Sequence, residues 1–93
     1  MVIGLLTLKL RIAHSQSLKE KRQAIKSLKD RLRRSFNVSV SETADQDTWQ
    51  ASSVSVVAVG TDSTGVNKTL NLVADTAGKD RLVELLRYEM EML

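Results

Sequence analysis

One long helical pattern constrains the fold of this chain more than any other feature. Residues 17–36 contain no Gly or Pro, and their apolar members recur at helical spacing along one side. Those members are Leu18, Ile25, Leu28, Leu32 and Phe36. Ser17 can cap the first turn, and Glu20 completes an S-x-x-E capping box. We therefore expect a helix over Ser17–Phe36 whose apolar face needs a second layer to cover it.

Three other segments have the pattern of strands or of strand-forming runs. In Val2–Ile12, leucines at every second position would share one face, with Thr7, Lys9 and Arg11 on the other. Asn37–Thr43 and Val54–Val59 are both β-prone, and the polar, turn-like residues 44–50 separate them. We expect these two runs to pair as a hairpin with a long tip.

The C-terminal third predicts a second helix and one further element. Thr61–Ala77 has an apolar helical stripe, Asp62 or Ser63 can cap it, and Gly78 suits the C′ position just after it. Leu82–Leu93 alternates apolar and charged residues like a strand, although its Leu, Glu and Met content also suits a helix. We predict a strand, because four strands around two helices bury more surface than three.

The resulting order is β-α-β-β-α-β. It predicts an α+β, ferredoxin-like fold with an antiparallel sheet and both helices on one face. The 93 residues form one domain, 1–93. Without Cys, the chain has no disulfide, thiolate nucleophile or Cys-based metal site. Its first twelve residues lack a charged leader and are interrupted by Lys9 and Arg11, so we expect no signal peptide, no membrane span and a cytoplasmic protein.

The net charge of +3 hides a strong asymmetry along the chain. Between Lys9 and Arg34, ten Lys or Arg residues face two acids, which leaves a local charge of +8. From Ser35 to the end, four bases face nine acids, which leaves −5. Such polarity indicates an anionic partner at one surface, or a self-complementary arrangement of chains.

Three stretches together resemble the YlxP-like family of small bacterial proteins, a domain of unknown function. They are Ser17-Leu18-Lys19-Glu20-Lys21-Arg22, Phe36-Asn37-Val38-Ser39-Val40-Ser41-Glu42 and Gln46-Asp47-Thr48-Trp49-Gln50. The resemblance implies a ferredoxin-like fold and supplies no catalytic residue. Genes of such proteins often lie beside genes for translation initiation and ribosome maturation, which implies a role around the ribosome or its RNA.

The expected first helix carries the main candidate site. Arg22, Lys26, Lys29 and Arg33 follow 4-3-4 spacing and form one stripe, with Lys19 near it. This stripe flanks the apolar face, so we expect it at the edge between helix and sheet, where it could follow a phosphate backbone. Lys9 and Arg11 could extend this nucleic-acid-binding surface. A solvated charged face explains the same pattern, and the sequence does not decide between the two.

The open face of the sheet is a second candidate surface. Lys9 and Arg11 would lie on it, joined by Arg87, Glu89 and Glu91. RNA-recognition modules stack bases on aromatic residues of the middle strands, and no aromatic residue is placed there, so we reject that mode. Mixed charge on an open face, or a free sheet edge, could instead join two copies of the chain.

Trp49 lies in the polar hairpin tip, where it could anchor a partner or stack on a base. We favour the alternative that it folds back over an end of the small core. His14 has no second His or Cys with which to bind zinc, and Asp45 and Asp47 are common turn residues. We therefore assign no metal site and no cofactor.

The leading hypothesis is a non-catalytic protein that binds structured RNA or a ribosomal subunit through the first helix. The alternative is a self-associating regulatory or adaptor module, for example a homodimer, that binds a protein or a small anionic ligand. We expect no enzyme, because no pair of groups can be assigned as acid and base, and none as nucleophile.

Overall fold

The computed structural model describes residues 1–93 and confirms the β-α-β-β-α-β order. The elements are β1 (Val2–Arg11), α1 (Leu18–Ser35), β2 (Ser39–Ala44), β3 (Ala51–Gly60), α2 (Ser63–Gly78) and β4 (Glu84–Met92). The ambiguous C-terminal segment is therefore a strand. Neither helix combines the length and apolar composition that crossing a membrane requires.

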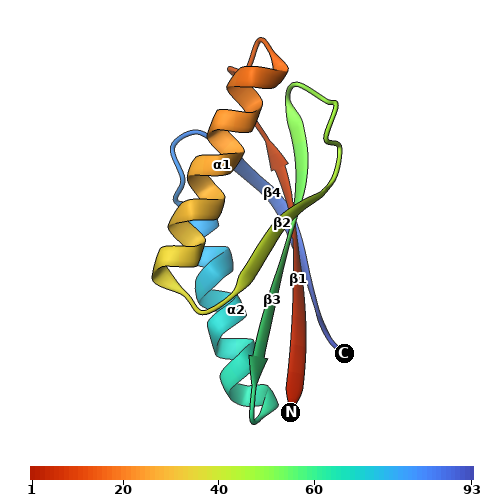
Figure 1. Ribbon diagram of the computed structural model, residues 1–93, viewed down its shortest axis with the longest axis vertical. Helices are drawn as coiled ribbons and strands as arrows, with labels where there is room; N and C mark the ends of the chain where they lie inside the picture. The colour runs from red at the N-terminus through yellow and green to blue at the C-terminus, as the bar shows by residue number, and fades with distance from the viewer.

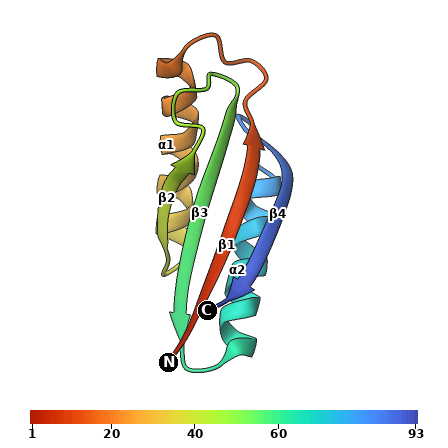
Figure 2. The same ribbon diagram turned by 90° about the vertical axis from the view of Figure 1, so that its right-hand side faces the viewer.

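The four strands form one antiparallel sheet in the order β2-β3-β1-β4. Both helices cover the same face of this sheet, with α1 on the side of β2 and α2 on the side of β4 (Figures 1 and 2). The fold is thus the predicted ferredoxin-like arrangement. Its two outer strands, β2 and β4, each have one edge without a partner strand.

The core lies between the sheet and the two helices, as the periodicities predict. Every second residue from Leu6 to Ile12, along β1 and just beyond it, is buried, and β3 adds Val54, Val56 and Ala58. The helices supply Ile25, Leu28, Leu32, Val66, Leu70 and Val73. Ser17 caps α1 as predicted, because its Oγ accepts from the N–H of Glu20, while Glu20 Oε2 accepts from the N–H of Gln16, one residue before the cap, instead of from that of Ser17.

Two glycines let α2 lie close to the sheet. A Cβ added at Gly4 would stand 2.6 Å from Val66 Cγ1 and 2.7 Å from Leu70 Cδ1, and one at Gly60 would stand 2.8 Å from Val66 Cγ2. These distances are far below van der Waals contact, so larger residues would push the helix away. Gly78, in contrast, does not occupy the predicted C′ position. It is the last helical residue, and no glycine of the chain has a positive φ.

The hairpin strands are displaced from their predicted bounds. β3 begins at Ala51 rather than at Val54, because Ser52 and Ser53 continue the backbone pairing with β1. Their side chains are both buried, although serine is not a strand-forming residue. β2 runs from Ser39 to Ala44, and its pairing with β3 is irregular between Glu42 and Ala44. Long-range pairing here overrides local propensity.

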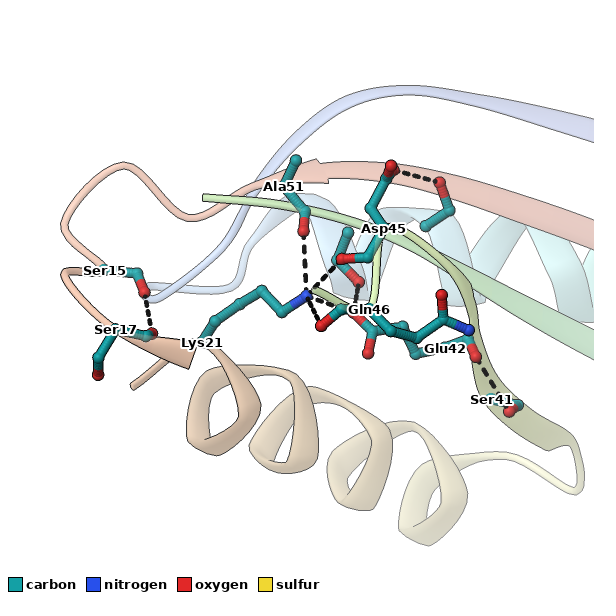
Figure 3. A network of polar contacts seen from close by, with 10 residues as sticks. Ser15, Ser17, Lys21, Ser41, Glu42, Asp45, Gln46 and Ala51 are labelled. Carbon is teal, nitrogen blue, oxygen red and sulfur yellow. Dashed lines mark hydrogen bonds and ion pairs between the residues drawn. The ribbon is translucent and has the colours of Figure 1, made fainter. Parts of the chain in front are cut away.

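Lys21 joins α1 to the hairpin tip (Figure 3). Its side chain is fully buried, and its ammonium group donates to the backbone carbonyl oxygens of Asp45, Gln46 and Ala51 at 2.7, 3.1 and 3.3 Å. Glu42 Oε2 lies 3.0 Å from the same nitrogen and also accepts from the hydroxyl of Ser52. The buried charge is therefore paired and surrounded by oxygen atoms, as burial of an ion requires.

Two further contacts fix the loops around this end of the molecule. The side-chain amide of Gln50 donates to the carbonyl oxygens of Ala13 and Ser15, which holds the β1–α1 loop against the hairpin tip. Arg31 Nη1 lies 3.0 Å from Asp80 Oδ2, and that carboxylate side chain is only 2% exposed. Because Asp80 also accepts from the N–H groups of Leu82 and Val83, it ties α1 to the α2–β4 loop.

Replacing Lys21 by Met should destabilise the protein by about 3–5 kcal/mol, because it leaves the largely buried carboxylate of Glu42, which is 14% exposed, and three backbone carbonyl oxygens without the ammonium group. Urea unfolding followed by circular dichroism measures this change. The matched control is Lys26→Met, further along the helix, where the lysine side chain is 75% exposed and the expected change is within about 0.5 kcal/mol. In the double variant Lys21→Met/Glu42→Gln, part of the stability should return. Equal midpoints for Lys21→Met and the wild type would show that the ammonium does not hold the tip.

Candidate nucleic-acid interface

The predicted stripe of cations lies along the side of α1 that faces the outer edge of β2. Arg33 fixes this placement, because its Nη2 donates to the backbone carbonyl oxygen of Val40 in β2 at 2.7 Å. Lys19, Arg22, Lys26 and Arg33 are exposed, and Lys29 is half-buried. The stripe therefore borders both a helix and a strand edge.

The cations of this surface differ in whether the chain already pairs them. Lys26 Nζ donates to Asp30 Oδ2 at 2.8 Å, and Arg33 Nη1 lies 3.8 Å from Asp30 Oδ1. Lys19, Arg22 and Lys29 make no side-chain hydrogen bond or ion pair within the chain. These three are available to an anion at no cost in internal contacts.

Asp30 is the acid that limits the positive charge of this surface. The hydrogen bond from Lys26 lowers the pKa of this carboxyl below its usual value, against an opposing effect of desolvation. The positive charges of Lys26, Arg33 and Arg34 lower the pKa further. Asp30 thus stays ionised over the physiological range and neutralises part of the stripe.

Lys9 and Arg11 do not extend this surface, which corrects one prediction from sequence, whereas their predicted place on the open face of the sheet is confirmed. Both lie on the opposite, open face of the sheet, because β1 is a central strand whose alternate side chains point away from the helices. Lys9 Nζ donates to Ser53 Oγ at 2.9 Å. Arg11 pairs with Glu84 on β4 at 2.8 Å. Contacts within the sheet therefore occupy both cations.

Trp49 is exposed over 54% of its surface and lies outside the core. The interpretation that it covers an end of the core is therefore wrong. Lys21 holds the hairpin tip, residues 45–50, against the first turns of α1, where Lys19 and Arg22 are also found. An exposed indole and unpaired cations thus come from two segments that a buried contact joins.

The structure also adds residues that the stripe did not include. Arg34 is exposed and unpaired on the outer side of α1, and with Lys26 and Asp30 it borders a shallow hollow. Lys21 belongs to the framework instead of the surface. Its sequence signal is its position, because Lys21, Ile25, Leu28 and Leu32 share the apolar side of the helix. A lysine within an apolar helical stripe predicts that an acidic side chain from another segment lies against it in the interior.

The exposed groups of this surface are mainly cations and backbone donors. Phosphate oxygens accept hydrogen bonds from two kinds of donor on this surface. One is the row of Lys and Arg side chains along α1, and the other is the set of unpaired backbone N–H groups at the outer edge of β2. No group of three or more His, Cys, Asp and Glu side chains is arranged to hold a metal ion. Asp45 serves the tip, where it adopts a left-handed φ of 63° and accepts from Ser53.

The sequence profile of a family described as "Protein of unknown function (DUF503)" matches residues 3–90, which include every helix and strand apart from the first residue of β1 and the end of β4. The chain belongs to this family. The resemblance in the three motifs is thereby confirmed at the level of the DUF503 family.

One relative and one solved structure give the extent of the similarity. The chain is 44% identical over 57 residues to "Uncharacterized protein YlxP" of Bacillus subtilis (strain 168). This match covers 61% of the present chain and 62% of the length of the relative. A de novo designed protein, Foldit4, has a TM-score of 0.53 over 98% of this chain and 96% of its own, at 15% identity. That likeness concerns the fold alone.

Asp30 should titrate below the ordinary aspartate value of 3.8, which carboxyl chemical shifts in NMR can follow. A carboxyl whose pKa is depressed on folding adds stability above its unfolded pKa. This contribution disappears as the pH falls through the lower, folded pKa. Lys26→Ala should move the pKa back up, because it removes the largest cause of the depression. An unchanged Asp30 titration in that variant would contradict the assignment.

Proposed function

We propose that this protein binds the phosphate backbone of structured RNA through a basic surface formed by α1 beside the edge of β2. The surface consists of Lys19, Arg22, Lys26, Lys29, Arg33 and Arg34. The gene neighbourhood expected of YlxP-like proteins makes a ribosomal subunit the first RNA to test. The role is one of binding, without a catalytic step.

The proposal rests on one observation: the cations of α1 divide into two that hold the fold together and six that remain at its surface. Lys21 and Arg31 are consumed by contacts that hold the fold. The remaining cations stay at the surface along some four turns, against only Glu20 and Asp30 as acids on the same helix. A helix that needed only solubility would alternate signs, because like charges at i,i+4 repel by a few tenths of a kcal/mol per pair.

The same geometry favours backbone contacts over base reading. Phosphate contacts from Lys and Arg fix position and carry no sequence information, whereas specific RNA recognition uses stacked, splayed bases. The open sheet face presents no aromatic side chain in its middle strands β1 and β3. Trp49 beside the first turns of α1 is the one aromatic group near the cations that could stack on an unpaired base. We therefore expect weak, salt-sensitive binding with little preference for sequence.

Reversing three exposed cations together should abolish RNA binding. The variant is Lys19→Glu/Arg22→Glu/Lys26→Glu, and binding to ribosomal subunits is measured by co-sedimentation at low and moderate salt. The matched control is Lys68→Glu/Lys79→Glu/Arg81→Glu, which changes the net charge equally on exposed positions of α2 and its following loop. Circular dichroism verifies that both variants fold. If both triple variants lose RNA binding equally, the effect is one of net charge alone. If the variant on α1 keeps its RNA binding, the proposed surface is refuted.

Removing the acid within the surface should strengthen binding. In Asp30→Asn, Lys26 and Arg33 lose their internal partner and become available to phosphate. The plot of log affinity against log salt should steepen by about 1–2 units, because each added phosphate contact contributes about 0.9. Asp75→Asn on exposed α2 gives the same change in net charge away from the surface and should leave the slope unchanged. A weaker affinity in Asp30→Asn would contradict the arrangement.

A further inference from the structure

We propose that β4 pairs with the β4 strand of a second copy of this chain, antiparallel and across a two-fold axis at Tyr88. The two four-stranded sheets would then form one continuous sheet. This inference does not rest on the proposed RNA binding, because β4 lies at the opposite edge of the sheet from β2 (Figure 2).

The outer edge of β4 is open, and its pairing with β1 is regular from Arg87 to Met92. Its nine residues contain no Pro. The N–H of Leu93 donates to the carbonyl oxygen of Ile3 at 2.8 Å, so odd-numbered residues at this end direct their backbone groups toward β1. In an antiparallel ladder the direction alternates, so the N–H and C=O groups of Tyr88 and Met90 point outward. These groups are free to form a second ladder.

Glu84, Leu85 and Met90 of β4 have partners within the chain, but most of the side chains from Leu86 to Glu91 do not. Arg87, Glu89 and Glu91 make no ion pair, and Arg87 lies directly opposite Lys9 of β1, a like-charge neighbour. Tyr88 lies opposite the buried Leu8, on the helix side of the sheet, yet it is 47% exposed, and the nearby Leu86 is 54% exposed. The unpaired N–H and C=O groups of an uncovered edge are a template for strand pairing. Charges on such an edge admit only a partner that places opposite charges against them.

The sequence of β4 is complementary to itself in one register. With Tyr88 on the axis, Arg87 of each copy lies opposite Glu89 of the other, and Leu86 lies opposite Met90. Moving the axis to Arg87 places two arginines in opposition. Moving it to Glu89 places two glutamates in opposition, although it also sets Arg87 opposite Glu91. A shift of the pairing by a single residue would place helix-side residues of one strand opposite open-face residues of the other. Only the register centred on Tyr88 pairs opposite charges without setting like charges opposite one another, and it is therefore the register that we propose.

This arrangement fixes how two copies lie. A two-fold axis through an antiparallel strand pair stands perpendicular to the sheet, so the helices of both copies cover the same face. The two β2 strands, and with them the two basic surfaces, would lie at the far ends of eight strands, about 34 Å apart at about 4.8 Å for each of the seven spacings. Such spacing would present two anion-binding surfaces on one side of the dimer.

A charge-swap experiment tests the pairing by sedimentation equilibrium over a wide range of protein concentrations. Arg87→Glu and Glu89→Arg each place like charges in opposition, so each variant alone should raise the dimer dissociation constant by about tenfold or more. An equimolar mixture of the two should form a heterodimer. In that heterodimer the introduced glutamate faces the introduced arginine in one pair, and the native Arg87 and Glu89 face each other in the other. The double variant Arg87→Glu/Glu89→Arg should dimerise like the wild type.

Two single variants distinguish dimerisation through the β4 edge from dimerisation through the open face of the sheet. Tyr88→Pro removes an outward N–H that β1 does not use, so it should leave the monomer folded by circular dichroism and prevent dimerisation. Val59→Lys places a charge on the open face, at a position 60% exposed, and should leave the dimer intact. A wild-type chain that is monomeric at every concentration would overturn the proposal. So would a dimer that survives Tyr88→Pro, or two charge variants that fail to combine.

Discussion

The buried contact between Lys21 and Glu42 is the interaction on which the rest of this structure depends. Taking an ammonium group out of water costs several kcal/mol, and only a nearly complete shell of acceptors offsets that cost. Glu42 and three backbone carbonyls supply this shell, and they come from β2, the hairpin tip and the start of β3. One side chain of α1 therefore fixes the helix relative to all three segments at once.

This contact also explains the irregular features around it. The carbonyl oxygens of Asp45 and Gln46 can converge on one nitrogen only if the chain turns sharply, and Asp45 has the left-handed φ that such a turn requires. Glu42 lies beside the irregularity in the β2–β3 pairing and receives the hydroxyl of the buried Ser52. The early start of β3 and its two buried serines thus form part of the environment of one lysine.

The periodicities of the sequence were sufficient for the element order, the sheet and most of the core. Helix and strand patterns report which face of each element is apolar, and Leu8, Leu28 and Leu70 are buried as those patterns require. The same reasoning failed where a residue's environment comes from a distant segment. Lys9 and Arg11 were predicted both to extend the basic surface and to lie on the open face of the sheet, and only the second placement is correct, because β1 directs them away from the helices. Trp49 was expected to fold back over an end of the small core, yet it is exposed at the tip that Lys21 anchors.

The candidate surface was predictable only in part, for a related reason. A helical wheel identifies Arg22, Lys26 and Arg33 as neighbours, but it cannot show that the adjacent layer is the edge of β2 or that Asp30 neutralises two of them. Basic residues that look uniform along the sequence serve three purposes in the fold: burial at Lys21, attachment to Asp80 at Arg31, and exposure along the stripe.

The two edges of the sheet show the same separation of roles. An unpaired edge strand invites association with other chains, so its surroundings decide what approaches it. The β2 edge is short and irregular, and Arg33 occupies the carbonyl oxygen of Val40 there. Cations beside that edge oppose a second basic copy and attract an anion. The β4 edge is longer, carries both signs of charge and has no such cover. The proposed anion binding and the proposed self-association therefore use opposite edges of the sheet and do not compete for the same surface.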